Sequence, residues 1–384
     1  MRTRPPAPED FRSRLRSAAV TSRVGLWLAV AFGVCFVTGL VSHYAQLPQQ
    51  PVRFPASPAW GYRVTQGLHV ISGTAAVPLL LVKLWSVYPR LFLRPSRRVR
   101  AVLVELAERA SIGVLVASAV FLLASGLANM TAWYPWDFSF RSTHYALAWV
   151  AIGALVLHVA VKLPRIRQAL GSDIDDDRLD RPSATEPGVL SRRGLLRTTW
   201  LAAGVAMVAT AGNSVGWLRD VSVLAVRSSD GPQGLPVTKS ARAAGVLETA
   251  TSPAYRLSVE HAGRNRALTL AELQALPQTT ETLPIACVEG WSENAEWTGV
   301  RLRTLLDLVG APTGATVSFE SLQESGPFRT SALPASFADD DRTLVALQVN
   351  GEGLALDHGY PARLIAPNRP GVRQTKWLSR VVVG

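Results

Sequence analysis

The chain has 384 residues, of which 48% are hydrophobic, and it carries a formal net charge of +12. Its mean hydropathy is positive, and its apolar residues gather in the first 220 positions. The arginines cluster beside long apolar runs, as membrane orientation requires, so the positive charge does not predict a nucleic-acid partner.

Five segments carry the roughly 18–22 mostly apolar residues that are needed to cross a ~30 Å hydrocarbon layer. They run approximately over residues 24–42, 64–85, 111–130, 145–161 and 195–218. The first is not a cleavable signal peptide, since no small-residue cleavage site follows it and a second apolar segment comes soon after. The sequence therefore predicts a membrane α-helical bundle of about five transmembrane helices.

Positive side chains flank alternate ends of these segments. By the positive-inside rule the N-terminus is cytoplasmic, the loop WYPWDF at 133–138 is an outer aromatic belt, and everything after the fifth segment lies outside the cytoplasm. We expect a multi-pass plasma-membrane protein with an extracytoplasmic C-terminal domain. The flanking residues are Arg2, Arg4, Arg12, Arg14, Arg16, Arg23, Arg90, Arg94, Arg97, Arg98, Arg100, Lys162, Arg165, Arg167, Arg192 and Arg193.

Four of the six histidines, His43, His69, His144 and His158, lie in or at the edges of these segments. Ionisable groups at membrane depth are costly and are functional candidates by default. His144 and His158 are 14 residues apart, which places them on one helix face about 21 Å apart. Two stacked haems between the helices of a four-helix bundle need such a ladder of neutral imidazoles.

His69 lies at the depth of His144, and this pair is predicted to bind a b-type haem. The alternative for His43 is an interfacial side chain that reaches toward water. His158 has no histidine opposite it, so one haem b is predicted and a second is left open.

The first four segments resemble the four-helix di-haem cytochrome b family, found in the membrane subunits of formate dehydrogenases and hydrogenases. The resemblance is carried by GLH at 67–69 and by the spaced histidines of the fourth segment. That family tends to place a ligand near the cytoplasmic side of its first helix, where this chain offers only His43 at the outer end.

The segment SDIDDDRLDRPSATEPG at 172–188 is acidic, contains proline and lacks periodicity, which predicts an exposed linker. Arg192 and Arg193 follow it and precede a moderately apolar span rich in Ala and Gly. This pattern resembles a twin-arginine translocation signal placed inside the chain. The alternative is that both arginines only supply positive-inside charge.

From about residue 235 the pattern changes to short β-rich runs separated by turn residues. The runs are YRLSV, ATVSFE, TLVALQVNG and SRVVVG, and the helical stretches are LTLAELQAL and LRTLLDLVG. Residues 235–384 are therefore predicted to form an α+β domain with a β-rich core.

Cys287 ends the apolar run LPIA and precedes the loop VEGWSENAEW, so we expect its sulfur at a strand-to-loop junction. The alternative is that Cys287 is only a small apolar residue of the core. A nucleophilic cysteine would need a histidine within reach, and His261 and His358 come without the local features of a cysteine-protease site. A soft thiolate that serves a transition metal remains.

Two stretches resemble the sulfite oxidase superfamily of molybdopterin enzymes. They are PIACVEGWSENAEWTGVRLRTLLDLVG at 284–310 and TLVALQVNGEGLALDHGYPARLIAPNRPGVRQTKWLSRVVV at 343–383. The pattern is nearest to the catalytic subunit of the bacterial periplasmic methionine sulfoxide reductase, which shares CVE-x-W-S and the following W-x-G. The resemblance implies that Cys287 coordinates molybdenum.

The resemblance also implies cofactor contacts. Arg363, Arg373 and Lys376 could bind the pterin phosphate, and Asn350 and His358 could contact the pterin. Gly359 and Gly371 could let the backbone approach the cofactor closely, and Trp291 and Trp297 would shape the mouth of the site. For each basic residue the alternative is a solvated surface charge.

Sulfite-oxidising members carry an Asn-Arg-Arg stretch after the cysteine, where this chain has Glu289, Gly290, Trp291 and Ser292. Sulfite is therefore a less favoured substrate. We predict a membrane-anchored molybdopterin oxidoreductase that exchanges electrons with a haem and a quinone or another carrier, and that reduces a small oxo-compound such as a sulfoxide. The alternatives are a sulfite-type dehydrogenase that feeds the haem, and a transmembrane cytochrome whose outer domain only binds a partner.

The expected organisation has four parts. Residues 1–170 form a cytochrome b-like four-helix transmembrane domain, and residues 171–194 form a cytoplasmic linker with the twin-arginine motif. Residues 195–220 form a fifth transmembrane helix, and residues 235–384 form the molybdopterin-binding oxidoreductase domain.

Overall fold

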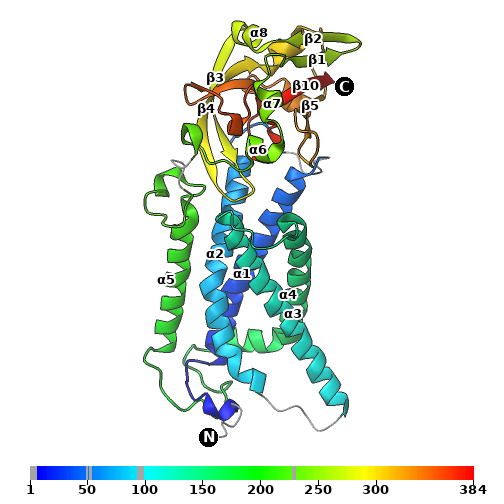
Figure 1. The fold of residues 1–384 in the computed structure, drawn as a ribbon. Helices are drawn as coiled ribbons and strands as arrows, with labels where there is room; N and C mark the ends of the chain where they lie inside the picture. The colour runs from blue at the N-terminus through cyan, green and yellow to red at the C-terminus, as the bar shows by residue number, and fades with distance from the viewer. Residues whose placement is uncertain (1–6, 49–50, 52–53, 93–98, 227–230) are drawn as a thin grey trace. The chain divides into compact units, whose positions relative to one another are not determined.

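The computed structural model describes residues 7–48, 51, 54–92, 99–226 and 231–384. Five helices in these ranges are long and apolar enough to cross a membrane, as predicted. They are α1 (Ala18–Gln46), α2 (Gly61–Val87), α3 (Val99–Met130), α4 (Phe140–Gly171) and α5 (Arg192–Ala211) (Figure 1). Of the flanking arginines, Arg2, Arg4, Arg94, Arg97 and Arg98 lie outside the described residues, as does the side chain of Arg100.

Helix α5 ends at Ala211 rather than at residue 218. The reason lies in Asn213, whose backbone carbonyl accepts a hydrogen bond from Ser292 N at 2.6 Å. Its side-chain oxygen accepts another from Val226 N at 2.9 Å. These contacts hold Asn213 in a turn, so the chain leaves the helix before it.

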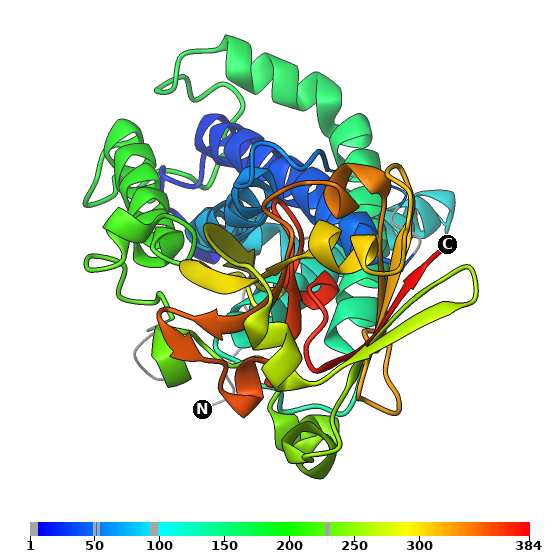
Figure 2. The same ribbon diagram turned by 90° about the horizontal axis from the view of Figure 1, so that it is seen from above.

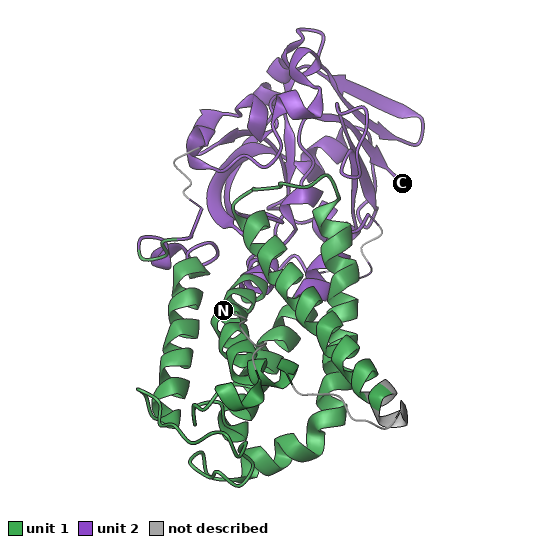
Figure 3. Ribbon diagram, turned by 60° about the horizontal axis from the view of Figure 1, so that its bottom comes forward, with its two compact units in different colours: residues 1–38, 68–211, 221–223 green, residues 39–67, 212–220, 224–384 purple. Residues whose placement is uncertain are grey.

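The chain divides into two compact units (Figure 3). Unit 1 comprises residues 1–38, 68–211 and 221–223, and unit 2 comprises residues 39–67, 212–220 and 224–384. Unit 2 thus includes the C-terminal part of α1 and the first turns of α2 together with the sheet-rich domain.

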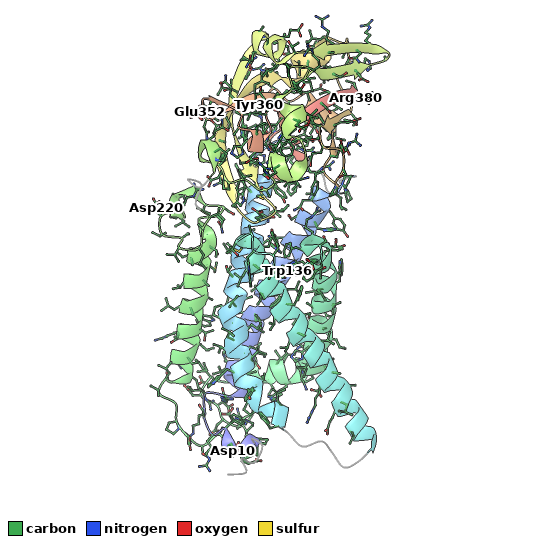
Figure 4. The ribbon with its side chains drawn as sticks, viewed as in Figure 1. Asp10, Trp136, Asp220, Glu352, Tyr360 and Arg380 are labelled. Carbon is green, nitrogen blue, oxygen red and sulfur yellow. The ribbon has the colours of Figure 1, made fainter. Side chains whose placement is uncertain are left out.

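Small residues let the helices of unit 1 approach one another closely. The buried set includes Ala31, Ala75, Ala76 and Ala203, beside Leu79. Helix α5 also contacts α2 through a hydrogen bond of 3.0 Å between the hydroxyls of Thr74 and Thr210. The loop between α3 and α4 carries Trp136, labelled in Figure 4, whose ring stacks on Phe138 with 5.0 Å between centroids.

The linker between α4 and α5 is mostly exposed or half-buried, as predicted, but it also makes a buried ion pair with α5. Arg192 donates to the carbonyls of Ile174 and Asp176 and pairs with Asp180. The side chains of Arg192 and Asp180 are only 8% and 6% exposed. Arg193 is exposed and pairs with Asp173 and Asp175. The linker therefore folds around the first arginine of the pair.

The sheet-rich domain of unit 2 contains two five-stranded sheets, seen from above in Figure 2. One sheet has the order β2-β1-β10-β5-β6, and the other has the order β3-β4-β7-β8 with β9 paired to β7. The strands are β1 (Leu257–His261), β2 (Arg264–Leu268), β3 (Gln278–Ala286), β4 (Ser292–Arg301), β5 (Val317–Ser321), β6 (Thr330–Leu333), β7 (Leu344–Val349), β8 (Glu352–Gly353), β9 (Arg363–Ile365) and β10 (Leu378–Val383).

Short helices α6 (Ala241–Ala244), α7 (Leu247–Thr251), α8 (Leu270–Ala275), α9 (Leu302–Asp307) and α10 (Ala335–Ala338) complete the domain. The predicted β-rich runs coincide with β1, β5, β7 and β10, and the predicted helical stretches contain α8 and α9. The α+β prediction is confirmed. One detail is wrong: β4 begins at Ser292, so the loop after Cys287 is shorter than the predicted 288–297.

Polar contacts tie the first turn of α2 to the sheet-rich domain within unit 2. Asn368 Oδ1 accepts a hydrogen bond from Tyr62 N at 2.6 Å, and Asn368 Nδ2 donates to Pro55 O at 2.7 Å. Arg63 donates to Asn294 Oδ1 at 3.0 Å. The fully buried ring of Tyr62 packs against Ala286, the residue before Cys287.

Candidate cofactor sites

Cys287 lies directly after β3, at the strand-to-loop junction that the sequence predicts. Its N–H donates to Trp291 O at 2.8 Å, and its own carbonyl accepts from Gly290 N at 3.1 Å. Gly290 has φ +91°, a conformation that favours glycine. The loop 287–291 is therefore tightly closed and fixes the position of the sulfur.

Cys287 is only 4% exposed and lies in a mixed environment. Its polar neighbours are Thr238 Oγ1 and Glu289 N, each 3.4 Å from Sγ. Burial, together with the charge of Glu289, raises the pKa of the Cys287 thiol to about 12. A metal that binds here must therefore displace the thiol proton.

Arg363, at the start of β9, is a buried cation with spare donors. Its Nη1 donates to His358 O at 2.8 Å, and its guanidinium lies 5.0 Å from the ring centroid of Trp297. Nε and Nη2 are buried without a hydrogen-bond partner among the described residues. Burial lowers the pKa of Arg363 to about 9. An unpaired buried charge costs several kcal/mol, so this position favours an anionic ligand.

Lys376 belongs to the same electrostatic cluster. Its Nζ donates to Asp357 O at 2.6 Å and to Lys239 O at 3.1 Å. Burial and the charge of Arg363 lower its pKa to about 7, against the opposing influence of Cys287, Asp357 and Glu289. Lys376 therefore lies within electrostatic reach of the thiol.

His358 and Asn350 both hold the segment 232–234 in place. Burial lowers the pKa of His358 to about 4, so the ring is neutral, and we assign its Nε2–H as the donor to Pro232 O at 2.7 Å. Asn350 lies exposed in the turn between β7 and β8, and its Nδ2 donates to Gln233 O at 2.8 Å. This segment leads to Thr238, beside the sulfur.

The other predicted residues are Arg373, the two tryptophans and Gly371. Arg373 donates to Thr330 O at 3.3 Å and lies in electrostatic contact with Arg369, where burial and Arg373 lower the pKa of Arg369 to about 9. Trp291 and Trp297 are 3% and 0% exposed and pack in the same buried cluster as Cys287. Gly371 allows its loop to approach the cysteine strand, since a Cβ there would lie 3.0 Å from Ala286 O.

Sequence reasoning did not single out Thr238 or Arg369, and it read Glu289 only as the replacement for a sulfite-binding residue. Thr238 lies 49 residues before Cys287 and carries no local signal. Glu289 is marked by its position two residues after the cysteine. Burial raises the pKa of its carboxyl group, which accepts a hydrogen bond of 3.1 Å from Trp291 Nε1.

The donor set fits a molybdopterin cofactor. A dithiolene cofactor needs one soft protein ligand for the metal and cations for its phosphate. Cys287 supplies the thiol, and Arg363 has unused buried N–H groups in the same part of the domain. Lys376 adds a second cation, whose hydrogen bonds among the described residues go to two backbone carbonyls.

His69 and His144 face each other inside unit 1. Their ring centroids are 6.3 Å apart, with an angle of 71° between the ring planes. Two imidazoles that bind one iron from opposite sides, with metal–nitrogen bonds of about 2 Å, give a centroid separation of about 6 Å. The two imidazoles would therefore be able to hold a haem iron between them.

The partners of both rings leave the same nitrogen available. His69 Nδ1 lies 2.8 Å from Cys35 O, and His144 Nδ1 lies 3.2 Å from Ser125 Oγ. Such partners of Nδ1 orient a ligating imidazole and leave Nε2 for the metal.

His158 does not face a second histidine among the described residues. The charged groups in electrostatic reach of His158 are Lys83, Lys162, Glu108 and Arg90. Lys83 follows His69 by 14 residues, the spacing that separates His144 from His158. Its Nζ donates to Thr21 O at 2.9 Å. An ammonium group thus lies within electrostatic reach of His158, where the described residues offer no second histidine.

His43 belongs to unit 2 and packs beside Tyr44, with 5.7 Å between ring centroids. No group of three or more His, Cys, Asp or Glu side chains that could hold a metal ion is found in the part of the chain that the structure describes.

Comparison with known proteins finds relatives of the C-terminal part of the chain. Residues 244–384 match the family model described as oxidoreductase molybdopterin binding domain. The mitochondrial sulfite oxidase of Drosophila melanogaster is 34% identical over 155 residues, which cover 34% of this chain and 27% of that protein.

A second curated relative is the putative protein-methionine-sulfoxide reductase subunit YedZ1 of Azospira oryzae. It is 35% identical over 118 residues, which cover 30% of this chain and 44% of that protein. The chain thus spans less than half the length of these relatives. Among solved structures, the sulfane dehydrogenase SoxCD of Paracoccus pantotrophus matches with 28% identity and a TM-score of 0.32, over 34% of this chain and 38% of that one.

Proposed function

Because residues 244–384 form a molybdopterin-binding oxidoreductase domain of the sulfite oxidase superfamily, we propose that the chain is a membrane-anchored molybdenum oxidoreductase. The observation that carries this proposal is the position of Cys287 beside buried cations, of which Arg363 has unused donors. The five apolar helices support the anchoring.

In this proposal each residue has a defined task. Cys287 holds the molybdenum, and Arg363 and Lys376 bind the phosphate of the pterin. His358 and Asn350 act through the segment 232–234, which brings Thr238 to the sulfur. The bound metal supplies two-electron oxygen-atom transfer.

We favour the reduction of a small neutral oxo-compound such as a sulfoxide. The carboxyl group of Glu289 lies next to Cys287, and when ionised it repels an anion such as sulfite. Reduction of a sulfoxide to a sulfide and water consumes two electrons and two protons. Burial moves the pKa values of both Glu289 and Lys376 toward neutrality, so these groups suit proton delivery.

The competing activity is a sulfite-type dehydrogenase, which the relationship to sulfite oxidases favours. Reduced-minus-oxidised haem spectra distinguish the two directions. We expect a sulfoxide to oxidise the pre-reduced haem in the wild-type chain and not in Cys287→Ser. Reduction of the haem by sulfite would overturn the proposed direction.

We further propose that His69 and His144 hold one b-type haem, which passes electrons from a quinone or another carrier. The facing rings and their oriented Nδ1 atoms support this assignment. Lys83 opposite His158 argues against a second haem. His69→Ala should abolish the haem absorbance, whereas His43→Ala should retain it.

Export of the C-terminal domain by the twin-arginine pathway completes the proposal, because a molybdopterin cofactor is inserted before export. Arg192 also holds the folded linker. Lysine at both Arg192 and Arg193 should therefore leave the domain in the cytoplasm.

A non-catalytic cytochrome with an outer binding domain is the alternative of another class. Quantifying molybdenum and haem in one preparation separates it from the enzyme. We expect one molybdenum per chain, lost in Cys287→Ser, and haem without molybdenum would favour the binding module.

A further inference from the structure

Four arginines line a hollow at the end of unit 1 where α1 begins. The hollow is partly enclosed, and its free volume of about 10 Å³ admits a water-sized group. Arg16 precedes α1, Arg90 follows α2, Arg165 lies in α4, and Arg181 lies in the linker to α5. We call this hollow the arginine pocket. Segments far apart in the sequence therefore bring four positive charges to one place.

The lining residues leave this charge largely uncompensated. Asp180 is their only acidic member, and it is already paired with Arg192 and accepts from Ala18 N at 3.2 Å. Arg181 donates to the backbone carbonyls of Pro8 and Phe11, at 3.2 and 3.0 Å. The nearby carboxylate of Glu108 is bonded to Lys162.

Arg165 likewise donates to a backbone carbonyl, that of Leu179, at 3.3 Å. The carboxyl group of Glu9 also interacts electrostatically with Arg181. Carbonyl oxygens orient a guanidinium group without neutralising it, so the pocket keeps a strong attraction for anions.

Arg16 is held in place by aromatic rings. Its guanidinium carbon lies 4.4 Å from the ring centroid of Trp85 and 5.0 Å from that of Phe11. Its Nη1 is buried and has no hydrogen-bond partner among the described residues. Burial, followed by the charge of Arg181, lowers the pKa of Arg16. An oriented donor without an acceptor is thus present at the pocket.

Membrane orientation alone does not require this arrangement. Arginines that only provide positive charge are expected to be exposed, as are Arg178 and Arg193, whose side chains are 82% and 59% exposed and paired with aspartates. The four pocket arginines instead converge on one hollow.

We propose that the arginine pocket binds a phosphate group. The guanidinium fork matches phosphate oxygens, and basic pockets between helices at the cytoplasmic side suit lipid head groups. The same chemistry would bind the head group of an anionic phospholipid or a free phosphate compound. This proposal is independent of the oxidoreductase activity.

The test compares the full chain with Arg16→Gln/Arg181→Gln and with the control Arg12→Gln/Arg178→Gln, whose arginines are exposed and paired with carboxylates. Native mass spectrometry after delipidation measures retained phosphatidylglycerol against phosphatidylcholine. Thermal unfolding in detergent with and without inorganic phosphate tests the soluble source. If either probe binds to the wild type and to the control, and the pocket variant binds it about tenfold more weakly, the pocket is supported.

Three results decide the remaining cases. Preferential loss of phosphatidylglycerol identifies a lipid, and loss of phosphate stabilisation alone identifies a soluble ligand. Equal binding by all three proteins, or equal loss in pocket and control variants, overturns the proposal. If the glutamine variant does not fold, the wild type is tested instead, and displacement of its phosphatidylglycerol by phosphate supports the pocket. The proposal is overturned if the wild type keeps the lipid at saturating phosphate and Arg16→Lys/Arg181→Lys retains it equally well.

Discussion

Lys376 shows how one residue can stabilise the loaded domain and destabilise the empty one. Its ammonium is partly buried near Arg363, and among the described residues it donates to two carbonyl oxygens. An anionic cofactor would compensate both cations. Without the cofactor the buried charge opposes folding, which makes the cost of the site measurable.

The pH dependence of the cofactor-free chain tests this description. The pKa of Lys376 is lowered from 10.5 to about 7 in the folded state, so the unfolded chain binds an additional proton between these values. Stability is therefore lost as pH falls from above 10 toward 7. Between pH 9 and pH 7 we expect a loss of about 1–2 kcal/mol, discounted for partial exposure. Denaturant titrations should show this loss in the wild type and not in Lys376→Met.

The range stops at pH 9 because Cys287 acts with the opposite sign above it. Its pKa is raised from 9 to about 12, so its contribution to stability is lost as pH rises through that interval. Equal pH slopes for the wild type and Lys376→Met would contradict a buried cation at this position.

Ser125 is expected to tune the haem through His144. Its hydroxyl lies 3.2 Å from Nδ1 and orients the ring. Loss of such a partner typically lowers metal affinity 10–100-fold. Ser125→Ala should therefore retain haem about tenfold less strongly, as measured by transfer to apomyoglobin. Ser118 is a matched control, because it is also buried in α3 but donates to Val114 O.

At the level of elements, the pairing of β4 with β7 depends on Gly299. A Cβ at this residue would lie 2.2 Å from Val345 O and 2.6 Å from Ala346 Cα, at the register shift between Thr298 and Gly299. Neither contact belongs to a flexible side chain. The two strands must separate locally to accept any larger residue.

Gly299→Ala should accordingly lower the free energy of unfolding by about 2–3 kcal/mol, the usual cost of overpacking. Gly353 in β8 is the control, since a Cβ there meets no atom within 4 Å. Chemical denaturation of both variants measures the difference. A destabilisation of the same size in Gly353→Ala would show that helix or strand propensity is responsible and not the close backbone contact.

The strands differ in how well the sequence alone predicts them. Strands β7 and β10 are rich in branched apolar residues, and β5 alternates Val317 and Phe319 with polar residues, so their own composition identifies them. Strand β4 is polar in sequence yet alternates buried and exposed positions, because it lies between β3 and β7. Its neighbours, which are distant in the sequence, supply its hydrogen bonds.

The same limit applies to the candidate sites. Cys287 stands in a recognisable local pattern, whereas Thr238 reaches the sulfur only through the folding of a segment with no pattern of its own. His69 and His144 follow from the depth of residues in apolar helices. Lys83 was missed because only histidines were considered as groups for a second haem.

At the scale of the whole molecule, charge and hydrophobic length determine the topology together. The linker between α4 and α5 contacts the segment before α1, through Arg181 and through a bridge between Ser13 and Glu186. Within unit 2, the end of α1 and the beginning of α2 lie with the sheet-rich domain. Unit 2 is thus built from chain segments that five membrane crossings would place on one side.

Cysteine labelling in whole cells tests this topology. The wild-type chain serves as background, because Cys287 is buried and Cys35 lies within α1. Thr185 in the linker and Ser325 between β5 and β6 are both exposed positions. A membrane-impermeant maleimide should label Ser325→Cys in intact cells, and Thr185→Cys only after the membrane is opened. Labelling of Thr185→Cys in intact cells would contradict this topology. Because positive charges flank alternate helix ends, the bundle would then have to insert against the positive-inside rule, with the C-terminal domain in the cytoplasm.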